Sequence, residues 1–583
     1  MRRPATLLAI ATGAAVGWVT TTATAEPVDA RWSIQRSDVV FMYQADRRTY
    51  EDYGATVLAW GGRPTPESLE AAAGVAFFGS VGMVTEFARY HDRFPETWAE
   101  GLCRDVRGRP YRVPWLTDHE HEGVPFCWCC TRQPTFRTYV EERVVDTVRR
   151  GAFGVHIDDH LGSSGSLFLG GCLCNPCVEG FREHLVALGP EERARLGVGD
   201  PATFDYGAVL RAWLGAAPAG EPRRVQDHPL WEEWSVYQTR GAAEYMARLR
   251  ALATREAQRP VPVSANAGLL WPHHLVDYES LDFFSAEVEH EAAERRLSDR
   301  PLFAYRMADA VGRRLASTAS GQDWAFVKEH DLDGLVRGWA ALSYAAGHSL
   351  MAPHRQWCYT EEKGTHWYDG PTEAYAPLYR FVRAHPELFD GMEAWADVTL
   401  VMPHRSWRRD RDPWLERGRR LAEANVAYRL ALGGDAMVVH RITPESLEGV
   451  PAVVSPAPAD LLAADRRAVE AHAGDAFGSV EEALEAVSPA VRAEGPVRVL
   501  PRVGEGRVVI HLLGRDYDPV SDTVRPLGDV AIEVDLEALG VADARRARVL
   551  SPEAEPVEVE VQGGRLAVPR VGLWTLVVLD APS

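Results

Sequence analysis

The segment 154–162, Gly-Val-His-Ile-Asp-Asp-His-Leu-Gly, gathers four ionisable side chains at the end of a short apolar run. Its first five residues alternate as a β-strand does, with successive side chains on opposite faces. If Val155 and Ile157 pack against helices, His156 and Asp158 face the other way and Asp158 closes the strand. Barrel enzymes carry their catalytic groups at that end of a parallel strand. The plainer alternative is that Asp159 or His160 caps a turn and Asp158 pairs with an arginine.

A second carboxyl group on another strand would complete an acid–base pair. The run 281–291 ends in three glutamates, of which Glu287 closes the predicted strand, with Glu289 and Glu291 as rivals that could be solvated charges at a helix start. Cleavage of a glycosidic bond uses two carboxyl groups, about 5–5.5 Å apart for retention of configuration or about 6.5–9.5 Å for inversion. We predict Asp158 as nucleophile or base and Glu287 as general acid, with Asp159 and His160 orienting or tuning them.

The cysteines carry a separate signal. Cys172, Cys174 and Cys177 bring three thiols into one short segment, and a fourth ligand could come from Cys127, Cys129 or Cys130, of which we take Cys127 for the prediction. Four thiolates form a closed, structural zinc site. Disulfides are the alternative, because an exported chain meets an oxidising environment.

Polar and aromatic residues near the predicted strand ends are candidates for binding a substrate. Aromatic faces stack on the C–H faces of sugar rings, and polar groups fix the hydroxyls. Each could instead belong to the core or satisfy backbone groups. The predicted substrate-binding residues are His156, His160, Asn266, Trp271, Arg306 and Trp357. The histidines and aspartates of the 156–160 segment could alternatively hold a metal ion for hydrolysis of an ester or amide bond.

The elements that position these residues alternate apolar runs with helical patterns, which predicts a (β/α)8 TIM barrel over residues 26–395. An open doubly wound sheet is the rival, but no glycine-rich phosphate-binding motif follows the first strand, and we expect no organic cofactor. The predicted strands are 39–43, 55–60, 75–81, 154–158, 261–265, 281–286, 302–305 and 349–352.

Two smaller domains follow the predicted barrel. Residues 396–480 predict a small α/β domain, with a strand over 397–402 and a helix over 415–432 that stops at Gly433 and Gly434. Residues 495–583 predict a C-terminal β-sandwich, because short apolar strands alternate there with turn residues.

Composition limits the partners. The formal charge of −20 argues against nucleic acid, which needs a basic surface. Residues 1–25 are typical of a signal peptide, with Arg2 and Arg3 before an apolar stretch and Ala23-Thr24-Ala25 as the cleavage site. We therefore expect a periplasmic or secreted bacterial protein with no membrane span after cleavage.

In the order of its motifs the chain resembles glycoside hydrolase family 42, the barrel β-galactosidases. A strand ending in Asp158 and an acid/base position is followed by the cysteine triplet and then by Phe181-Arg182. The resemblance implies a zinc site formed by the triplet and one upstream cysteine. It also implies an amidotransferase-like α/β domain after the barrel and then a small β domain. No cysteine follows Cys358, so the α/β domain would be structural or mediate a homo-oligomer.

The resemblance fails at the catalytic residues. The family's Asn-Glu pair falls on Asp159 and His160, and its strand-seven glutamate falls near Tyr305-Arg306-Met307, where there is no carboxylate. An acid on strand four with another on strand six is instead similar to α-galactosidase-type barrels. We expect a glycoside hydrolase acting on an exported oligo- or polysaccharide. The alternatives are a non-catalytic carbohydrate-binding barrel and a metal-dependent hydrolase.

Overall fold

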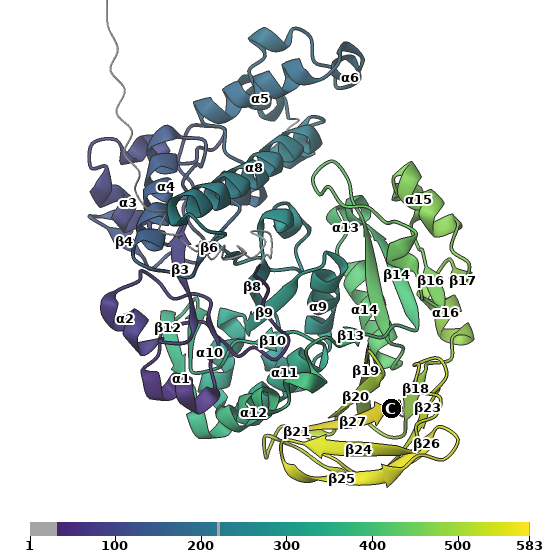
Figure 1. Cartoon of the computed structure of the whole chain (residues 1–583). Helices are drawn as coiled ribbons and strands as arrows, with labels where there is room; N and C mark the ends of the chain where they lie inside the picture. The colour runs from purple at the N-terminus through teal and green to yellow at the C-terminus, as the bar shows by residue number, and fades with distance from the viewer. Residues whose placement is uncertain (1–31, 218–221, 582–583) are drawn as a thin grey trace, which may run out of the picture.

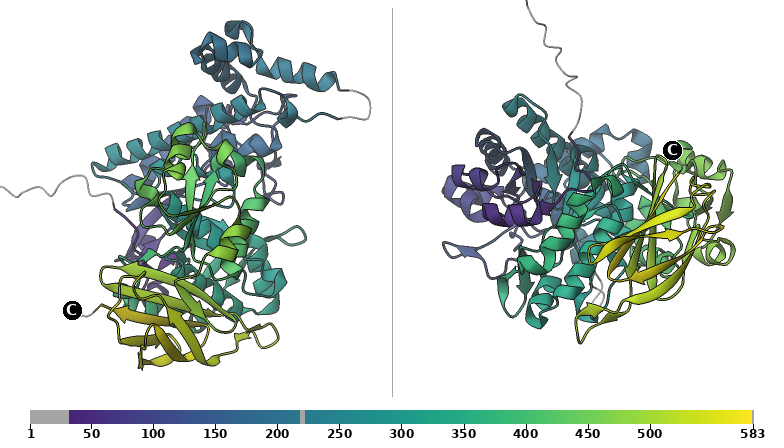
Figure 2. Two further views of the ribbon diagram at one scale, coloured as in Figure 1. Left: turned by 90° about the vertical axis from the view of Figure 1, so that its right-hand side faces the viewer. Right: turned by 60° about the horizontal axis from the view of Figure 1, so that its bottom comes forward.

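The computed structural model describes residues 32–217 and 222–581. Figure 1 shows a barrel in purple to teal, a parallel α/β part in green and two β sheets in yellow. Figure 2 shows the yellow sheets at one end of the molecule and the α5–α6 segment (Asn175–Ala187 and Pro190–Arg195) at the other. The predicted signal peptide, residues 1–25, lies outside the described residues.

The predicted (β/α)8 barrel is confirmed. Eight strands are neighbours in chain order, all parallel, and a bridge between Phe41 and Ala352 joins the last strand to the first. The amide of Ala352 donates to the Val40 carbonyl at 2.7 Å across this seam. The strands are β1 (Val40–Phe41), β2 (Val57–Leu58), β3 (Ala76–Gly82), β6 (Gly154–Asp158), β7 (Val263–Ala265), β8 (Phe283–Val288), β9 (Arg314–Ala319) and β10 (Ser349–Leu350).

One predicted strand is wrong. Residues 302–305 lie in helix α9 (Arg300–Ala310), and the seventh barrel strand is β9. Every residue from Pro301 to Ala308 is buried, so the helix has no solvent-exposed face in that stretch. The short apolar run at 302–305 therefore lacks the alternation of apolar and polar residues that identifies a surface helix. Pro301 in its first turn marks a helix start.

The barrel is filled in layers. Apolar side chains from alternate strand positions form its interior, which Trp32 closes by packing on Phe78, Phe153 and Phe283. The interior residues include Val40, Met42, Val57, Ala59, Phe78, Phe283, Ala316 and Met351. The next layer toward the strand ends is polar. Ser80 lies two positions beyond Phe78 on β3, His156 is paired with Ser80 in register, and Ser264 is paired with His156.

Helices cover the outside of the barrel, and two long insertions lie after β3 and β6. In the described residues no helix combines the length and apolarity needed to span a bilayer. The helices of this part are α1 (Arg47–Tyr53), α2 (Pro66–Ala71), α3 (Phe87–Arg93), α4 (Pro134–Arg149), α5, α6, α7 (Tyr206–Gly215), α8 (Trp231–Ala257), α9, α10 (Gly321–His330), α11 (Asp333–Ala345) and α12 (Thr372–Ala384). This part also contains two β-hairpins, β4–β5 (Glu120–His121, Val124–Pro125) and β11–β12 (Arg355–Thr360, Gly364–Asp369).

The α/β part is a four-stranded parallel sheet in the order β15-β14-β16-β17. The predicted helix over 415–432 is right only in its first part: α14 ends at Glu423, and Asn425 follows with a φ of 54°, a conformation that ends helices. The leucine-rich remainder is strand β15, paired with β14. The elements are β14 (Val398–Pro403), α13 (His404–Arg409), α14 (Asp412–Glu423), β15 (Tyr428–Gly433), β16 (Ala452–Val454), α15 (Ala463–Glu470), β17 (Asp475–Phe477) and α16 (Val480–Ala486).

The C-terminal part is a β-sandwich, as predicted. A six-stranded sheet, β13-β19-β20-β27-β24-β25, faces a three-stranded sheet, β18-β23-β26, over a separate apolar core. Strand β13 comes directly after the barrel and pairs with β19, so the first sheet begins before the α/β part. The strands are β13 (Glu393–Ala394), β18 (Val491–Ala493), β19 (Val497–Gly504), β20 (Arg507–Gly514), β23 (Leu527–Val534), β24 (Arg546–Ser551), β25 (Ala554–Glu560), β26 (Arg565–Val571) and β27 (Trp574–Asp580).

A buried ion cluster joins the sandwich to the barrel. Arg498 makes two hydrogen bonds to the Asp299 carboxylate, at 3.1 and 2.6 Å, and Arg515 adds a third at 2.6 Å. Burial alone would raise the pKa of Asp299, but the two guanidinium groups lower it below its usual range. Asp299 is therefore charged at neutral pH, and the charge is compensated.

We predict that Asp299→Ala destabilises the protein by about 3–5 kcal/mol, because two buried guanidinium groups lose their partner. Since the pKa of Asp299 is lowered in the folded state, the stabilisation is complete at neutral pH and is lost as pH falls through the acidic range. Urea unfolding followed by tryptophan fluorescence measures the loss. Glu416→Ala is the control, because its exposed pair with Arg419 is worth less than about 1 kcal/mol. Equal shifts for both variants would contradict the prediction.

Candidate active site

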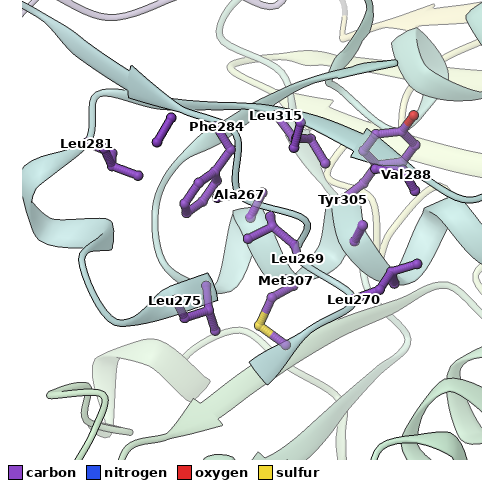
Figure 3. Close-up of a cluster of buried hydrophobic side chains, with 14 of the residues drawn as sticks. Ala267, Leu269, Leu270, Leu275, Leu281, Phe284, Val288, Tyr305, Met307 and Leu315 are labelled. Atoms are coloured by element: carbon purple, nitrogen blue, oxygen red, sulfur yellow. The ribbon is translucent and has the colours of Figure 1, made fainter. Parts of the chain in front are cut away.

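Three carboxyl groups lie at the carboxyl-terminal rim of the barrel. Asp158 ends β6, the fourth strand, Asp159 follows it, and Glu287 is the penultimate residue of β8, the sixth. On β8, Phe284 and Val288 pack outward in the apolar cluster of Figure 3, which includes Tyr305 and Met307 of α9. Glu287 alternates with these residues and therefore points to the barrel interior. Asp158, Asp159 and Glu287 are half-buried residues.

Three donors hold the Asp158 carboxylate. Asn266, the residue after β7, donates its Nδ2 to Oδ1 at 3.1 Å, and the Asp159 amide donates to the same oxygen at 3.0 Å. The hydroxyl of Thr85 donates to Oδ2 at 3.4 Å. Burial raises the pKa of Asp158, and these hydrogen bonds act against that rise by stabilising the charged form. Of the predicted substrate-binding residues, Asn266 is thus placed as a partner of the carboxylate.

Among residues 32–217 and 222–581, Glu287 and Asp159 have no comparable set of donors. Burial, and then the charge of Asp158, raise the pKa of Glu287 to about 8, so this side chain is protonated at neutral pH. Burial and the charges of Asp158 and Glu287 raise the pKa of Asp159 well above its usual range. Asp159 adopts a φ of 52°, and its buried Oδ2 has no hydrogen-bond partner in the described part of the chain. The rim therefore holds one hydrogen-bonded carboxylate beside protonated carboxyl groups.

His160 points away from the rim into a buried pair. Its Nδ1 lies 2.7 Å from Oδ2 of Asp277, and both side chains are buried. The His160 ring meets that of His274 edge to face at 5.3 Å. The charge of His160 acts to lower the pKa of Asp158, so the two groups are electrostatically linked. This arrangement suits the tuning role predicted for His160 better than direct binding of a substrate.

His156 lies one layer below the rim. Its ring stacks on Trp60 with centroids 4.6 Å apart, and its Nδ1 lies 3.0 Å from the Ser264 hydroxyl. Burial lowers the pKa of His156 well below its usual range, so the ring is neutral. The side chain is completely buried and forms the floor of the site. A substrate at the rim would not reach it, which differs from the predicted role.

Aromatic residues that the sequence analysis missed stand beside the carboxyl groups. Burial and then the charges of Glu287 and Asp158 raise the pKa of Tyr43 well above its usual range, which places this phenol next to both acids. The Tyr43 ring contacts Trp60 at 6.2 Å and Trp367 at 5.1 Å. Tyr43 and Trp60 are the last residues of two predicted strands, 39–43 and 55–60. Their position at strand ends could have indicated that they belong to the site. Thr85 lies in a loop, and its sequence position gave no indication that it contacts the site.

The remaining predicted binding residues are dispersed. Trp357, on β11, is partly exposed and stacks on Tyr359 with centroids 5.7 Å apart. Trp271 is 45% exposed in the segment after β7, and the Arg411 guanidinium lies 4.1 Å from its ring. Arg306 is wrong as a substrate ligand: it is 2% exposed on α9 and pairs with Asp309 at 3.4 Å. The error follows from the misassigned strand over 302–305.

Four cysteines converge in the insertions after β3 and β6. The sulfur atoms of Cys130, Cys172, Cys174 and Cys177 all lie within 4.8 Å of one another, and those of Cys174 and Cys177 lie 3.6 Å from Cys130. Tetrahedral zinc with Zn–S bonds of about 2.3 Å separates its sulfur ligands by about 3.8 Å, so the four thiols fit the ion.

The structure places Cys130, and not the predicted Cys127, in this group. Cys127 and Cys129 form isolated β-bridges with Arg112 and Leu102, and Cys130 is the member of the 127–130 segment whose sulfur reaches the start of α5. All eight cysteines are free thiols in the structure. Among the described residues, the 156–160 cluster is not one of the groups of His, Cys, Asp or Glu whose ligand atoms converge within 4.8 Å. The geometry thus gives no support to a hydrolytic metal there.

We predict that the Glu287 carboxyl group titrates near pH 8 and that Asp158→Asn lowers this pKa, because the variant removes a negative charge. The pKa stays above 4.5, since burial is the larger cause of the shift. Infrared spectroscopy of the protonated carboxyl band over a pH titration measures it, with Glu287→Gln identifying the band. Glu289→Gln, whose side chain pairs with Arg300 instead, leaves the titration unchanged. A Glu287 pKa near 4.5 in the unmodified protein would refute the assignment.

No family model matches the chain. By sequence it is 24% identical over 448 residues to an alpha-agarase from Thalassotalea agarivorans and 24% identical over 453 residues to one from Alteromonas agarilytica. These matches cover 70% and 69% of this chain but only 30% of each relative, so the matched part corresponds to less than a third of their length.

By structure the chain is similar to barrel β-galactosidases. The enzyme from Bacillus circulans sp. alkalophilus matches with a TM-score of 0.56 and 12% identity over 93% of this chain and 99% of its own. The enzyme from Rahnella sp. R3 matches with the same score and identity over 94% and 100%. A family 42 β-galactosidase from G. stearothermophilus reaches 0.54 at 10% identity. The chain thus shares the fold of the family 42 enzymes along nearly its whole length.

Proposed function

We propose that the chain is a glycoside hydrolase whose two working carboxyl groups are Asp158 and Glu287. The observation that carries this proposal is the unequal support of the two carboxyl groups at one rim of the barrel. Asp158 accepts three hydrogen bonds that act against the rise in its pKa caused by burial, while burial and the neighbouring charge keep Glu287 protonated up to about pH 8. Glycosidic cleavage requires this combination of one anionic and one protonated carboxyl group.

The roles follow from the protonation states. Glu287 donates its proton to the glycosidic oxygen as the bond from that oxygen to the anomeric carbon breaks. Asp158 either bonds to the anomeric carbon, to be displaced later by water, or takes a proton from a water whose oxygen forms the new bond. When Glu287 has lost its proton, Asp158 is neutral, as an ester to the sugar in the first case or as a carboxylic acid in the second. Glu287 then regains a proton from the attacking water in the first case, or by exchange with solvent in the second, and Asp158 becomes an anion again.

We propose an agar-type polysaccharide as the first substrate to test, because both sequence relatives are named alpha-agarases. Partly exposed aromatic rings in the segments after the barrel strands, Trp357 and Trp271 among them, suit stacking on sugar faces. The predicted signal peptide suits such a substrate, since a polymer that cannot enter the cell must be cleaved outside the cytoplasm.

Asp158→Asn and Glu287→Gln are expected to lower kcat by about 10²–10⁴-fold, the usual effect of removing a general acid or base. Reducing-end formation from agarose and release from aryl galactosides measure it. Activity falls as pH rises through about 8, because Glu287 then loses the proton that it must donate. Glu289→Gln is the matched control and keeps wild-type turnover.

The same variants separate the alternatives. A chain that binds saccharides without turning them over, and whose Asp158→Asn variant binds equally well, would be a carbohydrate-binding barrel. Turnover that survives Glu287→Gln but stops on removal of a metal from a variant without the cysteine group would indicate a metal-dependent hydrolase.

We also propose that Cys130, Cys172, Cys174 and Cys177 hold a structural zinc ion. Four thiolate ligands close the coordination sphere and leave no position for water or substrate, so the ion would tie the two insertions together and take no part in bond cleavage. Their burial and the 3.6 Å sulfur separations support this ligand set.

Cys130→Ser is expected to lose zinc from this site and to lower the melting temperature, because the binding free energy of a structural ion contributes to folding. Cys127→Ser is a close control: it removes a buried thiol three residues away that lies outside the group. Elemental analysis and thermal unfolding measure both effects. Equal zinc content in the two variants would exclude this ligand set.

A further inference from the structure

A second cluster of metal-ligand side chains lies in the insertion after β3, away from the cysteines. The ligand atoms of His91, Asp92 and His121 all fall within 4.8 Å of one another. His121 Nε2 lies 2.5 Å from Asp92 Oδ1, and His91 Nδ1 lies 3.9 Å from the same oxygen. A carboxylate oxygen of Glu122 lies 4.0 Å from His91 Nδ1. Two imidazoles and the Asp92 carboxylate therefore converge, and Glu122 stands beside them next to His91.

Two rigid elements position these groups. His91 and Asp92 are neighbours in the last turn of α3, and His121 and Glu122 lead into the turn of the β4–β5 hairpin. Glu122 and Gly123 have φ of 50° and 75°, the left-handed pair found in tight two-residue hairpin turns. That turn brings Glu122 back toward α3. Glu122 is not a glycine, and non-glycine residues adopt the left-handed conformation only uncommonly.

The imidazole of His91 is oriented by packing. Its ring lies 4.6 Å from the Trp98 ring and the side chain is 8% exposed, whereas Asp92 and Glu122 are exposed and can adjust. The rings of His91 and His121 meet at 79° with centroids 5.1 Å apart. One fixed nitrogen, a second nitrogen on a hairpin and two mobile carboxylates form a site open to ions from solvent.

We propose that His91, Asp92, His121 and Glu122 bind a divalent transition-metal ion of the zinc type. Nitrogen ligands select zinc-like ions over calcium or magnesium, which take oxygen ligands. Zn–N and Zn–O bonds of about 2.0–2.2 Å place tetrahedral ligands about 3.3–3.5 Å apart, between the 2.5 Å and 4.0 Å separations seen here. A small movement of Asp92 would bring three groups into range, and the exposed Glu122 side chain, which lies outside the 4.8 Å group, would move further to become the fourth ligand.

The ion would fix the rim of the candidate active site. The segment before the β4–β5 hairpin contacts the β11–β12 hairpin: Asp118 accepts from the Thr365 amide at 3.0 Å, and Thr117 lies 3.4 Å from the Tyr359 hydroxyl. The β11–β12 hairpin carries Trp357 and Trp367. A metal ion joining α3 to the β4–β5 hairpin would therefore restrict the movement of the segment that contacts these aromatic residues' hairpin.

The test is zinc titration of the tag-free full-length protein against a chromogenic chelator, together with elemental analysis. The wild type is expected to bind one zinc equivalent more than His121→Ala, and Cys130→Ser to retain that equivalent. His119→Ala is the matched control, because this histidine lies on the same segment and pairs with Asp118, outside the cluster. It is expected to bind as much zinc as the wild type.

A second readout uses cobalt in place of zinc. Cobalt bound to thiolates gives strong sulfur-to-metal charge-transfer absorption, whereas a nitrogen and oxygen site gives only weak d–d bands. The Cys130→Ser variant loaded with cobalt is expected to show weak d–d bands, which disappear when His121→Ala or Glu122→Gln is added. Equal zinc stoichiometry in wild type and His121→Ala, or cobalt bands unaffected by both substitutions, would overturn the proposal and leave the cluster as an ordinary ion pair.

Discussion

Mutual repulsion between buried carboxyl groups is the constraint on which the site depends. Asp158, Asp159 and Glu287 share one end of a closed barrel whose interior below them is filled with apolar side chains, so little solvent screens their charges. Hydrogen bonds decide which of them ionises first, and they are concentrated on Asp158. The division of acid and base roles that we propose rests on the positions of these donors.

The surrounding structure keeps those donors in place. Asn266 follows β7, between the strands that carry the two acids, and the Asp159 amide is fixed by a left-handed turn. Below them His156 is held neutral between Trp60 and Ser264 and adds no charge to the floor. The β-sandwich is also joined to the barrel, because Arg498 and Arg515 donate hydrogen bonds to Asp299.

Sequence patterns predicted most of the framework. Seven of the eight strands, including the one ending in Asp158, could be read from apolar runs because strands buried on both faces are short and bounded by turns. The prediction over 302–305 failed because a helix buried on all sides looks the same over four residues. The predicted helix ran past the end of α14 because leucines recur on both sides of Asn425, which marks the break between helix and strand.

The sequence by itself determined the chemistry available: which strand ends carry acids, and that three cysteines stand close together in one short segment. Only the tertiary structure decided which groups meet. It selected Cys130, turned His160 toward Asp277 and buried Arg306. It also set Tyr43 beside both acids. The physical reason is that distances between residues far apart in the chain, and the burial that shifts their pKa values, arise only when the barrel closes.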